Sequence, residues 1–157
     1  MREGFLMLDS MERYADHALL IMRAFVGAFL IWGVWDNVIS AERMQEFVAF
    51  LAKFGFVAPQ FMAALSVWVQ LLIGIGFVLG LLTRWAAVLC IINFAVAIVM
   101  VDRFGGLRGA FPSGCLVVIG LYLATRGAGR FSLDEIVGRR REAHRRASEQ
   151  IPEGAAV

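Results

Sequence analysis

The chain has 157 residues, 60% of them hydrophobic and 18% charged, and its formal net charge is +2. With a mean hydropathy of +0.73, this composition fits one small membrane domain and excludes anything larger. Seven of the fifteen Lys and Arg residues follow Thr125, so the basic character belongs to the C-terminal tail.

Residues 1–17 are mixed in charge, and we expect a segment outside the membrane rather than a cleaved signal peptide. Residues 18–39 follow as the first predicted span. Arg23 lies within the first two turns of this span, and we expect its long side chain to reach the nearer lipid headgroups. Asp36 and Asn37 lie at the opposite end, about 20 Å from Arg23 along the helix axis. Arg23 and Asp36 therefore cannot pair within this helix.

Residues 40–58 are too polar to cross a membrane. Ser40 can cap a helix here, and apolar side chains then recur at steps of three and four residues. This pattern predicts an amphipathic helix that rests on the outer surface of the bundle or of the membrane.

The stretch 59–101 is strongly apolar, and Arg84 is its only charged residue. A membrane-spanning helix needs about 20 mostly apolar residues, so this stretch is long enough for two. We predict an antiparallel pair of spans over residues 59–82 and 85–101, joined by a tight turn at residues 80–84.

Small residues in the second predicted span favour close helix packing, and those singled out are Gly74, Gly76 and Gly80. The last two form a GxxxG pattern, which would also suit a homo-oligomer. Gln70 in the second span and Asn93 in the third each lie near mid-depth. They either hydrogen-bond to each other across the two helices or bind a ligand, and both interpretations remain open.

Residues 102–111 are predicted to form a Gly-rich loop, and residues 110–125 to form the fourth span. The tail, residues 126–157, carries a capping-box pattern at Ser132 and Glu135 that predicts the start of a charged helix. The tail lacks interleaved aromatic residues, so we expect no nucleic-acid binding. Five arginines of the tail are expected to contact anionic lipid headgroups, namely Arg139, Arg140, Arg141, Arg145 and Arg146.

Together these elements predict an all-α fold, a membrane four-helix bundle with an amphipathic helix between spans 1 and 2 and a basic C-terminal helical tail. The N-terminus, the turn between the second and third spans, and the tail would share one side of the membrane and hold ten Lys and Arg residues. The opposite side holds four. The positive-inside rule then predicts a multi-pass protein of the inner cell membrane with both termini in the cytoplasm.

The residues disfavour several redox cofactors. His17 and His144 lie outside the predicted spans, so we expect no haem. Cys90 and Cys115 lie apart within apolar runs, which predicts small buried side chains, no iron–sulfur cluster and no metal site. A quinone needs only an apolar cleft with a few hydrogen-bonding groups. The candidate ligand-binding residues are the polar ones of the spans: Arg23, Asp36, Asn37, Gln70 and Asn93.

Three stretches carry a resemblance to a known family, and they read IMRAFVGAFLIWGVWDN, SVWVQLLIGIGFVLGLLTR and RGAGRFSLDE. In these stretches, and in the order of its elements, the chain resembles the DoxX family of small four-helix membrane proteins over roughly residues 18–137. The resemblance implies a four-helix bundle with both termini inside. It also implies a partner or membrane anchor of redox enzymes, because the family takes its name from a subunit of a quinone-linked oxidoreductase system.

The chain departs from the family pattern at two positions. Members of the family commonly have a lysine near the end of the first span and an acidic residue in the second. This chain has Asp36 and Gln70 in those places. Asp36 and Gln70 therefore either replace the polar site that the family's charged pair forms or abolish that site.

Three functions follow as hypotheses. The favoured one is a non-catalytic accessory or anchor subunit of a quinone-linked membrane redox system, which would not be an enzyme by itself. The alternative is a quinone-binding oxidoreductase subunit with its own intramembrane site, and the second alternative is a small oligomeric permease. The expected partners are membrane lipids, a redox enzyme and further copies of the chain.

Overall fold

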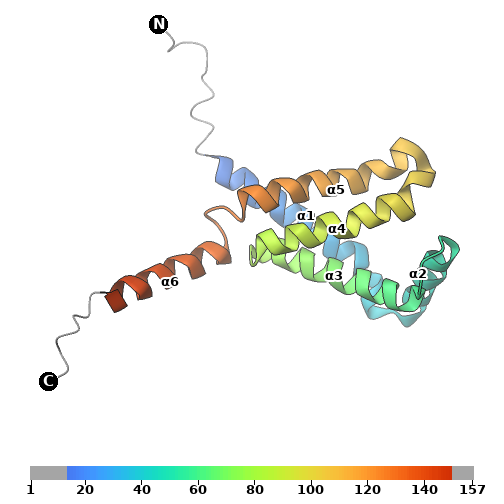
Figure 1. The fold of residues 1–157 in the computed structure, drawn as a ribbon, viewed down its shortest axis with the longest axis horizontal. Helices are drawn as coiled ribbons and strands as arrows, with labels where there is room; N and C mark the ends of the chain where they lie inside the picture. The colour runs from blue at the N-terminus through green and yellow to red at the C-terminus, as the bar shows by residue number, and fades with distance from the viewer. Residues whose placement is uncertain (1–13, 150–157) are drawn as a thin grey trace, which may run out of the picture.

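The computed structural model describes residues 14–149, except for the side chains of residues 143, 144 and 146–149. Most of the segment expected at residues 1–17 therefore lies outside the described residues. Residues 14–149 form helices and no strand, which confirms the predicted all-α fold. In chain order the helices are α1 (Ala15–Ile39), α2 (Ala41–Lys53), α3 (Pro59–Leu79), α4 (Thr83–Met100), the 3-10 helix η2 (Asp102–Gly105), α5 (Gly106–Arg126) and α6 (Leu133–Glu149) (Figure 1).

Within residues 14–149, four helical segments are long and apolar enough to cross a membrane: α1, α3, α4 and the combined segment Asp102–Arg126. Their outer surfaces carry large apolar side chains, and Phe25 and Trp32 are 73% and 76% exposed. A water-soluble bundle would hide side chains of this size, whereas lipid is a favourable surrounding for them.

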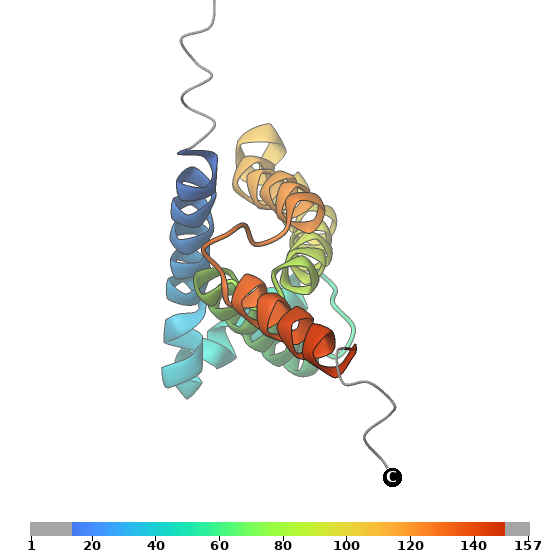
Figure 2. The ribbon, with the colours of Figure 1, turned by 90° about the vertical axis from the view of Figure 1, so that its left-hand side faces the viewer.

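The four long helices pack in sequence, with α1 along α3, α3 along α4 and α4 along α5. Seen from the end in Figure 2, α1 and α5 stand on opposite sides of the bundle, and the loop after α5 crosses from one side toward the other. At the α1–α3 contact the backbones approach closely, since a Cβ atom on Gly27 would lie 2.6 Å from the carbonyl oxygen of Gly74. Such glycine pairs let membrane helices pack through dispersion forces.

The core lies between the four helices. Gly76 faces Ala86 at the α3–α4 contact, where an added Cβ would lie 3.2 Å from the Ala86 side chain. The largest apolar side chains that are fully buried are Leu30, Val67, Ile73, Phe77 and Leu123. Gly74 and Gly76 of α3 are therefore both used for close packing within the chain, against α1 and α4 respectively.

The prediction of a loop over residues 102–111 is wrong, because α5 already begins at Gly106 and continues through Pro112. The Ser113 hydroxyl donates a hydrogen bond to the Asp102 carboxylate and so joins η2 to the early part of α5. Glycines are frequent in membrane helices, where lipid offers exposed backbone groups no alternative hydrogen-bond partner. The glycine content was therefore a poor indicator of a loop at this position.

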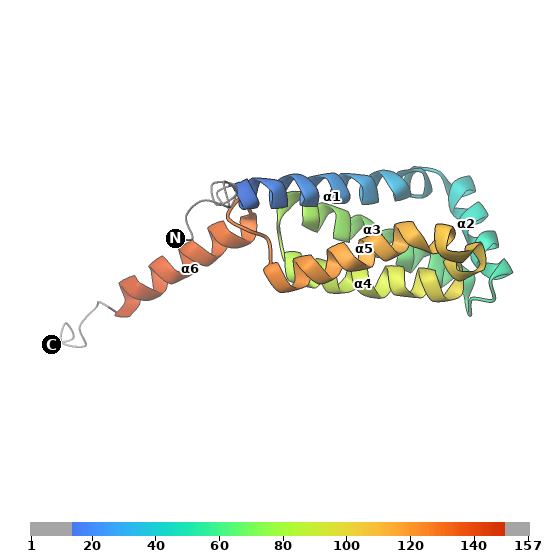
Figure 3. The same ribbon diagram turned by 90° about the horizontal axis from the view of Figure 1, so that it is seen from above.

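Helix α2 closes one end of the bundle, at the far end from α6 (Figures 1 and 3). As the sequence predicts, the Ser40 hydroxyl caps this helix by accepting the backbone N–H of Arg43 at 3.3 Å. Phe54, just beyond α2, packs on Phe104 with ring centroids 5.9 Å apart. The other end of the bundle carries α6, the α3–α4 turn and the start of α1, and the charged side chains described below gather there.

Candidate functional site

Arg23, on α1, is completely enclosed by protein, with an exposed fraction of 1%. Its guanidinium donates to the carbonyl oxygens of Ala128 and, at 2.7 Å, of Phe131. The expectation that Arg23 reaches lipid headgroups is therefore wrong. The physical reason is that the loop over residues 127–132 folds across the end of α1 and supplies the acceptors that lipid phosphates would otherwise provide.

Asp134 ties the same loop to the turn between α3 and α4. Its two carboxylate oxygens accept the backbone N–H groups of Leu82, at 2.7 Å, and Thr83, at 2.9 Å. Its own N–H donates to the carbonyl of Gly80 at 3.0 Å. Leu82 is the N-cap of α4 and provides no side-chain cap, so Asp134 satisfies donors that begin this helix and places a negative charge at its positive end.

Gly80 lies where these two sets of contacts meet. A Cβ atom there would lie 2.5 Å from Arg23 Nη1 and 2.7 Å from the Ser132 side chain, and the backbone φ of +65° also favours glycine. We call Arg23, Gly80, Asp134 and the loop 127–132 the end clasp. It joins α1, the α3–α4 turn and α6 by hydrogen bonds across long sequence distances.

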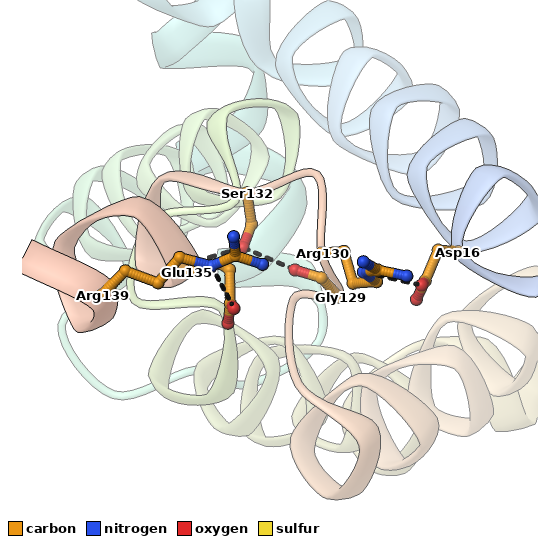
Figure 4. A network of polar contacts seen from close by, with 6 residues as sticks. All are labelled: Asp16, Gly129, Arg130, Ser132, Glu135 and Arg139. Atoms are coloured by element: carbon orange, nitrogen blue, oxygen red, sulfur yellow. Dashed lines mark hydrogen bonds and ion pairs between the residues drawn. The ribbon is translucent and has the colours of Figure 1, made fainter. Parts of the chain in front are cut away.

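The start of α6 is held by a local network, shown in Figure 4. The Ser132 hydroxyl donates to the Gly129 carbonyl at 2.7 Å and accepts the N–H of Glu135 at 3.2 Å, which is the serine half of the predicted capping box. The Glu135 carboxylate accepts from Arg139 at 2.9 Å instead of returning to the cap. Arg130 lies 4.0 Å from Asp16 and so links the loop to α1.

Beside the end clasp lies an open basin of about 640 Å³. It is formed by the start of α4, the end of α5, the connecting loop and the start of α6. The residues that line it are Asp16, Leu82, Arg84, Trp85, Arg126, Gly127, Ala128, Gly129, Arg130, Ser132, Asp134 and Glu135.

Two cations of the basin, Arg84 and Arg126, make no hydrogen bond or ion pair with another residue of the described chain. The three acids are all engaged, because Asp16 faces Arg130, Asp134 caps α4 and Glu135 accepts from Arg139. The lining holds three arginines and three acids, so its formal charge is balanced, but Arg84 and Arg126 themselves have no ion-pair partner among the described residues.

The sequence-predicted hydrogen bond between Gln70 and Asn93 is absent, and each side chain has another partner. Gln70 donates to the carbonyl of Leu30 on α1 at 3.2 Å, whereas Asn93 accepts from the Ser66 hydroxyl at 3.3 Å. The reason is that α3 is packed between α1 and α4, so Gln70 points to the first neighbour and Ser66 to the second.

Asp36 and Asn37 lie at the end of α1 that faces α2, far along the helix from Arg23. Asn37 donates to the carbonyl of Arg43 at 3.2 Å and so joins α1 to α2, while Asp36 is exposed. The five candidate ligand-binding side chains are thus spread over both ends and the middle of the bundle. They do not meet in one pocket.

The described arginine side chains of α6 are exposed to solvent. Arg139, Arg140, Arg141 and Arg145 are exposed, and the side chain of Arg146 is not described. The helix leaves the bundle more nearly along the bundle axis than across it (Figures 1 and 3). Among the described residues, α6 packs along none of the other helices.

The cysteines and acids of the described residues form no group that could hold a metal ion. Cys90 is buried in the core and Cys115 is half-buried. The functional residue that the sequence pattern did not indicate is Asp134, which lies within the stretch RGAGRFSLDE. An arginine within an apolar span needs buried acceptors somewhere in the fold, so Arg23 was a signal for the loop over residues 127–132 but not for Asp134.

A family model described as DoxX matches residues 18–103. The match begins in α1, covers α2 to α4 and ends in η2, so the loop and Asp134 of the end clasp lie beyond it. No curated protein and no solved structure matches the chain.

Proposed function

The chain belongs to the DoxX family, and we propose that it is a non-catalytic accessory or anchor subunit of a membrane redox system. Its four apolar helices make it an integral, multi-pass membrane protein. The proposed location is the inner cell membrane with both termini in the cytoplasm. Ten Lys and Arg residues on the side of the termini, against four on the other, support this orientation.

The observation that carries the proposal is the position of α6. Asp134 and Ser132 fix the base of this helix, yet beyond its first turn it extends from the bundle without packing along another helix. Leu133, Ile136 and Val137 share one side of it at spacings of three and four residues and are 38%, 49% and 43% exposed. A fixed helix with a basic surface and uncovered apolar side chains is suited to docking an acidic protein surface.

The membrane-embedded polar residues support the non-catalytic part of the proposal. Arg23, Gln70 and Asn93 are each hydrogen-bonded within the protein, to the clasp loop, to α1 and to α3 respectively. The quinone-binding alternative would need several such groups around one headgroup. Arg23 and Asp36 lie about 20 Å apart along α1, so a single quinone headgroup cannot contact both.

The test is purification of the full chain from native membranes in mild detergent, followed by mass spectrometry of intact complexes. We expect the wild-type chain to carry a stoichiometric oxidoreductase. Replacing Arg140 and Arg141 with Glu should remove most of that partner, because both arginines are exposed on α6. The matched control replaces Arg103 and Arg108, two exposed arginines at the opposite end, with Glu and should keep the partner.

Two results would contradict the proposal. One is a wild-type chain that purifies alone, or only with further copies of itself, from the membranes in which it is made. The other is a partner that stays bound equally in the α6 variant and in the control. A quinone that co-purifies with the chain alone would transfer support to the alternative function.

A further inference from the structure

The basin beside the end clasp can be considered separately from the docking role proposed for α6. Two arginines of the basin have no ion-pair partner among the described residues, which points to a bound ligand. Arg84 and Arg126 both line this cavity of about 640 Å³, a size typical of small-molecule sites. A Cβ on Gly127 would lie 3.3 Å from Arg84 Nε, so the Arg84 side chain rests against the loop peptide. The two cations thus share one cavity wall formed by the start of α4, the end of α5 and the loop over residues 127–132.

The depth of the two arginines follows from helix length. Arg84 is the second residue of α4 and Arg126 is the last residue of α5. The 18 residues of α4 give a length of about 27 Å, close to the hydrocarbon thickness of about 30 Å. A helix of this length has its ends at the headgroup region, where lipid phosphates lie.

The electrostatics favour an anion at the wall of the basin that holds Arg84 and Arg126. Arg84 lies in the first turn of α4, where the helix dipole adds to the positive potential. The Asp134 carboxylate keeps its negative charge at the same helix end, but its oxygens face the backbone N–H groups of Leu82 and Thr83 and form no ion pair with Arg84 or Arg126. Trp85, which also lines the basin, is 71% exposed. Tryptophan at this depth is typical of the membrane–water interface, where its ring meets the glycerol region of lipids.

We propose that this basin is a binding site for one anionic phospholipid, with the lipid phosphate between Arg84 and Arg126 and the glycerol region against Trp85. Arginine suits this role because its planar guanidinium can donate two hydrogen bonds to one phosphate. Basic pockets between transmembrane helices at the membrane surface bind anionic lipid headgroups by the same physics. The site differs from the arginines of α6, which lie farther from the bundle.

The experiment is native mass spectrometry of the full-length purified chain titrated with phosphatidylglycerol, with phosphatidylcholine and, separately, with inorganic phosphate. We expect one phosphatidylglycerol to bind to the wild-type chain and phosphatidylcholine to bind at least tenfold more weakly. Replacing both Arg84 and Arg126 with Gln should weaken phosphatidylglycerol binding at least tenfold. Replacing Arg103 and Arg108 with Gln, which removes equal charge at the opposite end, should leave binding unchanged.

Each alternative outcome overturns the proposal. Equal weakening in the two double variants would mean that net charge, and no site, attracts the lipid. Displacement of phosphatidylglycerol by millimolar inorganic phosphate would identify a site for free anions instead of lipids. Replacing Arg84 and Arg126 with Lys keeps the charge but loses the planar fork, so binding should be weaker than in the wild type and stronger than in the Gln variant.

A second measurement uses only the unmodified chain and so remains informative if the variants fold poorly. Phosphatidylglycerol added to the chain in neutral detergent should raise the melting temperature, since a ligand of the native state stabilises it by mass action. An equal rise with phosphatidylcholine would overturn the proposal.

Discussion

One carboxylate oxygen of Asp134 accepts the backbone N–H of Thr83 at 2.9 Å, so a residue at the start of α6 caps the start of α4. The same carboxylate accepts the N–H of Leu82, and no side chain from within α4 provides this cap. The base of α6 is thereby attached to the turn between two membrane helices. The direction in which α6 leaves the bundle depends on this attachment.

Replacing Asp134 with Ala should lower the free energy of unfolding by about 1–2 kcal/mol, the usual cost of a lost helix cap. Thermal unfolding in detergent measures the change. Limited proteolysis should also show faster cleavage within residues 127–132, which would lose their tie to α4. The control is Glu142→Ala, an exposed acid on α6. Equal melting temperatures for the two variants would contradict the capping role.

Replacing Arg23 with Leu should destabilise the chain by about 3 kcal/mol, because the carbonyls of Ala128 and Phe131 would stay buried without their donor. Arg23→Lys should recover only part of this loss, since an ammonium group cannot match the fork of the guanidinium. Thermal unfolding is again the measurement, with the exposed Arg108→Leu as the control. Similar stability of the two Leu variants would show that the buried contacts add nothing.

The all-α fold and the four spans were predictable because lipid imposes one simple requirement on the chain. A span must be long, apolar and helical. The stretch 59–101, in which Arg84 is the only charged residue, meets this requirement twice over and is easily recognised in the sequence. The prediction failed at residues 102–111, where glycine was taken as a helix breaker by rules that apply in water. In lipid the backbone N–H groups have no water to bind, so the helix is favoured even where glycine is frequent.

The end clasp was not predictable from local pattern. Arg23 and Phe131 are 108 positions apart, and the contact needs the loop after α5 to cross the bundle end toward α1. The capping-box pattern at Ser132 indicated where α6 begins but gave no information on what lies opposite. The predicted hydrogen bond between Gln70 and Asn93 failed for a related reason. Equal depth in neighbouring helices does not determine which way a side chain faces.

Gly27→Ala should weaken the contact between α1 and α3. The added Cβ would lie 2.6 Å from the Gly74 carbonyl oxygen, and a backbone atom cannot move aside cheaply. We expect a loss of about 1–3 kcal/mol, as for other overpacked sites. The matched control is Gly114→Ala on α5, where an added Cβ meets nothing within 4 Å. If both variants unfold at the same temperature, close backbone approach is not what holds α1 to α3.

Gln70→Leu separates a packing role from a ligand role within the membrane. The substitution removes one hydrogen bond to the Leu30 carbonyl, and interhelical bonds of this kind contribute about 0.6 kcal/mol in membranes. We therefore expect a small drop in melting temperature, an intact bundle and unchanged amounts of any co-purifying redox partner. The matched variant Asn93→Leu removes the bond from Ser66 and should behave alike. If Gln70→Leu instead abolished quinone-dependent turnover of the purified complex while Asn93→Leu preserved it, Gln70 would contact the quinone, and the chain would be more than an anchor.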